Sequence, residues 1–164
     1  MGFNIVLVEP EIPTNTGNIG RLSLASGSVL HLVKPLGFEL NDKRLKRAGL
    51  DYWKHISINI YENIEEFFLK NKDANMVYFS SSATKNYTTI NFQDNMFFLF
   101  GKESVGLSKE ITVKNLEIIG KFRVLNKKNA RKRSKFDLSL NAFLLLLKSI
   151  ISNLKSFYTP LGRL

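Results

Sequence analysis

The sequence contains no cysteine and only two histidines, His31 and His55, among its 164 residues. The absence of cysteine excludes a disulfide scaffold and a cysteine-ligated zinc site, and two histidines are too few for a histidine-rich metal site. We therefore expect no bound metal. The longest uninterrupted apolar run, residues 142–147, is far too short to cross a membrane. The amino terminus also lacks the basic and apolar regions of a signal peptide, so we expect a cytoplasmic protein with no membrane partner.

Basic residues are in clear excess, because 24 Lys and Arg against 14 Asp and Glu give a net charge of +10. The excess is concentrated in residues 121–135, where eight of 15 residues are basic and none is acidic. Like charges repel one another in a solvated loop, so this density favours binding to a phosphate backbone. A membrane surface, or a basic tail without a partner, is the alternative. A second basic cluster, which includes Arg44 and Arg47, falls on a short predicted helix at residues 42–49.

Short apolar strands alternate with helices along the chain. The predicted strands span residues 4–8, 28–33, 56–61, 76–80, 96–100 and 117–124. Besides residues 42–49, the predicted helices span residues 62–70 and 108–113, and a long apolar helix starts at Asp137. A further helix ends at Gly27 and has Thr14, Asn15 or Thr16 as its N-cap. This alternation predicts a single α/β domain over residues 1–164, with a mostly parallel sheet and helices on both faces.

Residues 15–21, with the sequence Asn-Thr-Gly-Asn-Ile-Gly-Arg, open the helix after the first strand. They match only part of a glycine-rich dinucleotide fingerprint, because Asn15 stands where the first glycine belongs and the preceding loop contains two prolines. Backbone amides at a helix N-terminus, together with Asn15, Asn18 and Arg21, suit contacts to phosphate or ribose. The alternative is a capped helix whose glycines allow close packing.

A second glycine-containing segment, Phe-Gly-Lys-Glu-Ser-Val-Gly-Leu at residues 100–107, follows an apolar strand. Gly101 at the carboxyl end of a parallel strand would let a ligand approach the backbone, and α/β sheets bind their ligands at this end. A simple glycine-containing turn is the alternative.

Three segments taken together, residues 4–22, 30–52 and 99–107, closely resemble the small SPOUT-class methyltransferases. The resemblance is to the group that methylates the ribose 2′-hydroxyl of the tRNA wobble nucleotide, position 34, a cytidine or modified uridine. It covers essentially the whole chain. It implies S-adenosylmethionine as the methyl donor, a deep trefoil knot in the C-terminal part of the α/β fold, a homodimer, and tRNA bound across that dimer.

The resemblance also implies the site residues. Arg21 matches the arginine that the family places at the reacting ribose, and Glu103 matches the acid of the middle motif. The implied cofactor-binding residues are Phe79, Ser80, Gly101, Glu103, Val124, Leu125, Ser134 and Ser139, the two serines being alternatives for one place. The implied RNA-binding residues are Asn15, Asn18, Arg44, Arg47, Lys127, Lys128, Arg131, Lys132 and Arg133.

Methyl transfer to a ribose hydroxyl is an in-line displacement, in which the protein mainly positions the two reactants. Because arginine stays protonated in proteins, we expect Arg21 to orient the ribose and stabilise the developing alkoxide. A phosphate or a water molecule then accepts the proton. His31 and His55 are expected to be structural.

The basic segment departs from the family pattern. The family usually has Arg-Ile-Pro-Met where this chain has Arg-Val-Leu-Asn at residues 123–126, and Asp137 replaces an asparagine at the start of the last helix. If these changes abolish cofactor binding, the alternative is a non-catalytic RNA-binding protein on the same fold. A second alternative is 2′-O-methylation of a different RNA, such as rRNA. Apolar residues cover more than one face of the last helix, which predicts that it packs against a second subunit.

Overall fold

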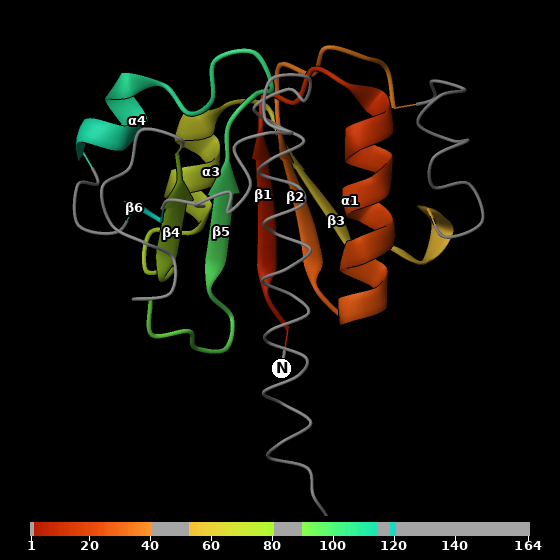
Figure 1. The fold of residues 1–164 in the computed structure, drawn as a ribbon, viewed down its shortest axis with the longest axis horizontal. Coiled ribbons are helices and arrows are strands. Elements are labelled where there is room, and N and C mark those ends of the chain that lie inside the picture. Colours follow the sequence, from red (N-terminus) through yellow and green to blue (C-terminus); the bar gives the residue numbers. More distant parts are fainter. Residues whose placement is uncertain (1, 41–52, 81–89, 115–118, 121–164) are drawn as a thin grey trace, which may run out of the picture.

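A computed structural model of the chain describes residues 2–40, 53–80, 90–114 and 119–120. These residues form a six-stranded parallel sheet in the order β3-β2-β1-β5-β4-β6 (Figure 1). The strands are β1 (Asn4–Val8), β2 (Val29–Val33), β3 (Ile58–Tyr61), β4 (Met76–Phe79), β5 (Phe97–Phe100) and β6 (Ile119–Gly120). The parallel α/β sheet predicted from the sequence is therefore confirmed. The predicted helices at residues 42–49 and from Asp137, and the C-terminal knot, lie outside the described residues.

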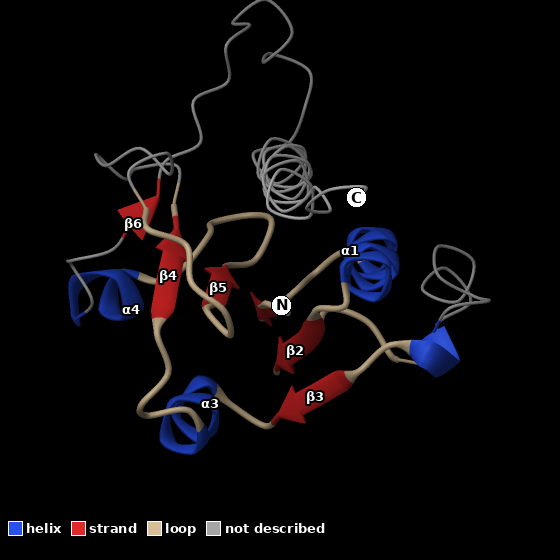
Figure 2. Ribbon diagram, turned by 90° about the horizontal axis from the view of Figure 1, so that it is seen from below, coloured by secondary structure: helices blue, strands red, loops and turns tan. Residues whose placement is uncertain are grey.

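Helices cover both faces of the sheet, as predicted. Helix α1 (Pro13–Ser26) lies on one face, and α3 (Ile64–Lys70) and α4 (Lys109–Lys114) lie on the other (Figure 2). Side chains alternate between the faces along each strand, so Ile5 and Leu7 pack with Ile19 of α1, whereas Val6 and Val8 pack in the cluster that contains Phe67 of α3. A strand buried on both faces needs an uninterrupted apolar run, and β1 provides one.

Helix α1 begins earlier than the sequence predicts and has a different cap. The N-cap is Ile12, whose side chain makes no capping hydrogen bond, and Pro13 occupies the first turn. The prediction of Thr14, Asn15 or Thr16 as the N-cap is wrong, because proline is pre-organised for the first helical position and starts the helix at residue 13. The predicted end is confirmed, since Gly27 adopts the left-handed conformation with φ of 67°.

Other boundaries shift by a few residues. Strand β3 starts at Ile58 and not at residue 56, because Trp53–His55 form a 3-10 helix, η1. Helix α3 starts at Ile64, because the side chain of Asn63 accepts a hydrogen bond of 2.8 Å from the Glu66 amide and caps it.

Strands β1 and β5 lie side by side in the sheet, but the chain leaves them toward opposite faces. The connection after β1 leads into α1, and the connection after β5 leads into α4 on the other face (Figures 1 and 2). This is a topological switch point, where open α/β sheets bind ligands beyond the carboxyl ends of the strands. The two glycine-containing segments at residues 15–21 and 100–107 therefore meet at one edge of the sheet.

Candidate active site

Three loops meet at the carboxyl ends of β1, β2 and β5. Residues 9–12 follow β1, residues 34–40 follow β2, and residues 101–107 follow β5. Gly37 donates its amide to the Pro10 carbonyl at 2.9 Å, and a Cβ on Gly37 would lie only 2.7 Å from Glu11 Cα. The first two loops are thus in backbone contact, which no side chain at position 37 would permit.

The loop after β5 folds back on itself directly after the strand. The Gly106 amide donates to the Lys102 carbonyl at 2.8 Å, and a Cβ on Gly101 would lie 2.0 Å from the Gly106 carbonyl carbon. Only glycine fits at position 101, because any side chain would collide with the returning backbone. This explains the glycine in structural terms and leaves its backbone uncovered by a side chain of its own.

Glu103 joins the loop after β5 to the start of α1. Its side chain is 8% exposed, and both carboxylate oxygens accept hydrogen bonds. Oε2 accepts from the Glu11 amide at 2.7 Å, and Oε1 accepts from the Ile12 amide and from Asn15 Nδ2, both at 3.2 Å. The carboxylate therefore satisfies amides at the N-terminus of α1, where a helix favours negative charge. It acts as a cap supplied from about 90 residues further along the chain.

The residues on either side of Glu103 make similar links. Lys102 forms an ion pair of 2.6 Å with Glu9, and the hydrogen bond from this pair raises the pKa of Lys102. Ser104 donates its amide and its hydroxyl to the two carboxylate oxygens of Glu11, both at 2.9 Å. We call Glu9, Glu11, Lys102, Glu103 and Ser104 the interloop network.

The sequence alone does not single out Glu9, Glu11, Lys102 or Ser104 as site residues, and the family resemblance assigns Glu103 to the cofactor. The available signal was a pair of glutamates directly after one strand and a Lys-Glu-Ser run after another. These residues can be predicted to contact one another only once β1 and β5 are known to be neighbours.

The predicted ribose-side residues all lie on α1. Asn15 is half-buried and donates to Glu103, whereas Asn18 and Arg21 are exposed and lie three residues apart on one side of the helix. Gly20, between them, packs closely on η1, since a Cβ there would lie 3.1 Å from Trp53. Close packing, the structural alternative for these glycines, thus applies to Gly20.

The predicted cofactor-side residues that the structure describes lie next to one another. Phe79 and Phe100 pair at the last rung between β4 and β5, with stacked rings 4.9 Å apart, so Ser80 and Gly101 leave the sheet side by side. Strand β6 ends at Gly120, which pairs with Phe79 on the other side of β4. Val124, Leu125, Ser134 and Ser139 lie outside the described residues, as do the predicted RNA-binding residues Arg44, Arg47, Lys127, Lys128, Arg131, Lys132 and Arg133.

His31 has the structural role that the sequence predicts. Its Nδ1 lies 2.9 Å from the Tyr61 hydroxyl and its Nε2 lies 3.0 Å from Asn4 Oδ1. Burial lowers the pKa of His31 from 6.5 to about 4, so the ring is neutral at physiological pH.

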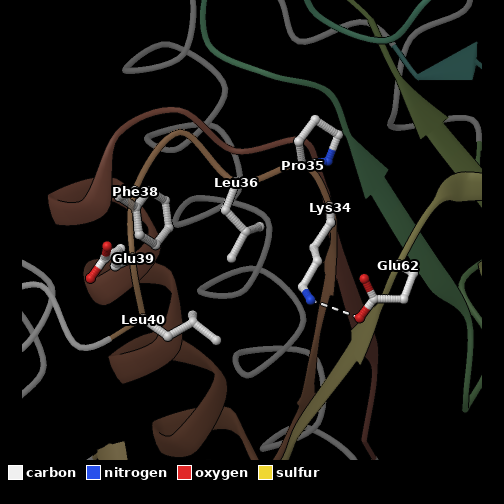
Figure 3. Close-up of a pocket in the computed structure, with 7 residues that line it drawn as sticks. All are labelled: Lys34, Pro35, Leu36, Phe38, Glu39, Leu40 and Glu62. Carbon is white, nitrogen blue, oxygen red and sulfur yellow. Dashed lines mark hydrogen bonds and ion pairs between the residues drawn. The ribbon is translucent and has the colours of Figure 1, made fainter.

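An open hollow of about 720 Å³ lies beside this site (Figure 3). Leu36, Phe38 and Leu40 line it from the loop after β2, and the ion pair between Lys34 and Glu62, 2.7 Å long, borders it. In the described ranges, no cluster of His, Cys, Asp or Glu is placed to hold a metal ion, and no helix is long and apolar enough to span a membrane.

Comparison with known proteins identifies the family. The SpoU rRNA Methylase family matches residues 2–131. The chain belongs to this family. It is 48% identical over 109 residues to the tRNA (cytidine(34)-2′-O)-methyltransferase of Methylovorus glucosotrophus, and the match covers 66% of this chain and 71% of that protein. The enzyme of the same name from Saccharophagus degradans is 45% identical over an equal length.

Solved structures share the fold of this chain. A structure described as giving insights into the 2-OH methylation of C/U34 on tRNA superimposes with a TM-score of 0.81 at 29% identity, covering 93% of this chain and 97% of the other. The SpoU methyltransferase AviRb of Streptomyces viridochromogenes, solved with AdoMet, has a TM-score of 0.74 at 15% identity, which shows a shared fold.

Proposed function

We propose that this SpoU-family protein transfers a methyl group from S-adenosylmethionine to the ribose 2′-hydroxyl of nucleotide 34 of tRNA. One observation carries the proposal: the interloop network joins the helix with Asn15, Asn18 and Arg21 to the loop of Gly101 at the switch point. Two relatives that are 45% and 48% identical carry this activity in their names.

The residues at the switch point fit S-adenosylmethionine. Its sulfonium is a cation. The interloop network has a net negative charge, because it contains one ammonium, that of Lys102, and three carboxylates, those of Glu9, Glu11 and Glu103. The side-by-side ends of β4 and β5 at Ser80 and Gly101 would hold the rest of the cofactor through backbone groups. The bound cofactor supplies an electrophilic methyl group.

The role of this chain is then to position the ribose and stabilise charge. Arg21 is exposed on α1, a little over two turns after the helix start that Glu103 fixes. In this proposal its guanidinium orients the ribose and stabilises the oxyanion that develops as the 2′-hydroxyl loses its proton. A phosphate or water accepts that proton, because an arginine does not deprotonate in proteins.

The charge distribution supports tRNA as the substrate. Residues 121–135 carry eight of the ten net positive charges of the chain, so the remainder is close to neutral. Electrostatic attraction to phosphates is thereby concentrated in one segment, which we propose to be the main tRNA contact. The homodimer and the cytoplasmic location expected from the sequence are part of the same proposal.

The experiment is methyl transfer by the purified protein from labelled S-adenosylmethionine to total tRNA, followed by mapping of the ribose methylation. Label on the 2′-oxygen of nucleotide 34 is the expected result. Calorimetry with the cofactor alone is run beside it. RNA binding without cofactor binding or transfer would instead identify a non-catalytic RNA-binding protein, and label only in added rRNA would move the substrate to rRNA.

A further inference from the structure

The side chain of Glu11 accepts two hydrogen bonds from Ser104, 93 positions further along the chain. The Ser104 amide donates to one carboxylate oxygen and the Ser104 hydroxyl donates to the other, both at 2.9 Å. The link is reciprocal, because the amide of Glu11 donates to the carboxylate of Glu103, the neighbour of Ser104, at 2.7 Å. Each loop therefore both offers and receives a carboxylate.

The backbone of Glu11 is also fixed from its other side. A Cβ on Gly37 would lie 2.7 Å from Glu11 Cα and 2.9 Å from its carbonyl oxygen, so the loop after β2 packs directly against this residue. Ser104 lies within the turn that the hydrogen bond from the Gly106 amide to the Lys102 carbonyl closes. Glu11 thus stands where the loops after β1, β2 and β5 meet, two residues before α1 begins.

We propose that Glu11 is a positioning residue for methyl transfer, an inference that rests on the proposed function. Through Ser104 it holds the ribose-side helix α1 at a fixed distance from the cofactor-side loop 101–107. Glu11 acts through Ser104 and touches neither reactant. An in-line displacement depends steeply on alignment, and a misplacement of about 1 Å can cost about a hundredfold in rate.

The chemistry of the Glu11–Ser104 pair separates geometry from charge. In Glu11→Gln, the amide oxygen accepts from the Ser104 amide and the amide nitrogen donates to the Ser104 hydroxyl, which can accept as well as donate. Both bonds are kept and the negative charge is lost. Glu11→Ala loses both bonds. If Glu11 acted only by attracting the cationic cofactor, the two variants would be equally impaired.

The test compares kcat and KM for tRNA methylation in the full-length protein. We expect Glu11→Ala to lower kcat by about tenfold to a hundredfold, with KM for tRNA and the cofactor Kd within about threefold of wild type. Glu11→Gln should recover most of the lost kcat. Glu65→Ala, which removes an exposed carboxylate from α3 on the opposite face of the sheet, is the matched control and should behave as wild type.

A second variant covers the case in which Glu11→Ala fails to fold. Ser104→Ala removes one hydroxyl from an exposed residue and keeps the backbone bond to Glu11. It should lower kcat severalfold. Wild-type kcat in both Glu11→Ala and Ser104→Ala, or equal losses in Glu11→Ala and Glu11→Gln, would overturn the proposal.

Amide hydrogen exchange separates this proposal from the proposed function. Without tRNA or cofactor, Glu11→Ala should accelerate exchange at residues 102–106 and 11–16 together, whereas Glu65→Ala should not. If wild type transfers no methyl group to tRNA, the proposed function fails. The exchange result then still decides whether Glu11 holds the two loops together, and unchanged exchange at residues 102–106 would refute that.

Discussion

The side chain of Glu103 gives the sharpest test of the site geometry. Its two carboxylate oxygens accept three N–H donors, from the Glu11 amide, the Ile12 amide and Asn15 Nδ2. Glu103→Gln keeps the shape of the side chain but replaces one of its two acceptor oxygens with an NH2 group. In either orientation, the new amide group points its own N–H donors at N–H donors of the loop before α1. We therefore expect Glu103→Gln to be destabilising, although it is a conservative change in size.

The magnitude follows from the donors that lose their acceptor. A hydrogen bond to a charged group contributes about 1.5–3 kcal/mol, and leaving a buried donor unsatisfied costs about 1–3 kcal/mol. The less harmful orientation of Glu103→Gln orphans one backbone amide and removes the negative charge at the helix N-terminus, which adds about 0.3–1 kcal/mol. We expect a loss of about 2–3 kcal/mol in the free energy of unfolding. Glu103→Ala orphans all three donors and should lose about 4 kcal/mol.

The assay is urea unfolding of wild type, Glu103→Gln and Glu103→Ala, with Glu65→Gln as a control that removes an exposed charge from α3. The midpoint should fall while the slope of free energy against urea stays constant, because the native fold is unchanged. A Glu103→Gln protein within about 0.5 kcal/mol of wild type, the range of an ordinary surface substitution, would refute the three-donor geometry.

Three further predictions concern His31, Gly101 and Arg21. As pH falls from 6.5 to about 4, stability should fall, because the unfolded chain takes up a proton that folded, buried His31 does not. In urea unfolding at several pH values, His31→Gln should make the free energy of unfolding depend less steeply on pH, by up to about 1.4 kcal/mol per pH unit. An unchanged pH dependence would contradict the assignment. Gly101→Ala should abolish cofactor binding in calorimetry, because its Cβ would lie 2.0 Å from the Gly106 carbonyl carbon; wild-type affinity would exclude this loop from the cofactor site. Arg21→Ala should lower kcat by about 10²–10³-fold with an unchanged cofactor Kd, and Arg21→Lys should restore little; wild-type turnover in Arg21→Ala would remove Arg21 from the mechanism.

The strands could be predicted from the sequence because their signal is local. Residues 4–8 form a mainly apolar, partly β-branched run that ends two residues before Pro10, and β1 has the predicted bounds. The order of the strands is a different matter. Placing β5 beside β1, with β2 and β3 on the other side, depends on where each crossover passes, and no short segment encodes that.

The start of α1 shows the same limit at one helix end. Thr14, Asn15 and Thr16 are good N-cap residue types, yet the helix begins at Pro13 and Asn15 uses its side chain to donate to Glu103. The acceptor that satisfies the amides of this helix start comes from the loop after β5. A local rule cannot find a cap that arrives from 91 positions away.

Glu103 also shows why a family resemblance and a structure answer different questions. The resemblance selects Glu103 as a residue of the middle motif and assigns it to the cofactor. In the structure, its carboxylate accepts from two amides of the loop before α1 and from the Asn15 side chain in the first turn of α1, and Lys102 and Ser104 beside it bind Glu9 and Glu11 of that loop. Three consecutive side chains thus link the loop after β5 to the loop before α1, whatever contact Glu103 makes with the cofactor. A motif can thus be indispensable to a reaction because it sets the distance between the two sides that must react.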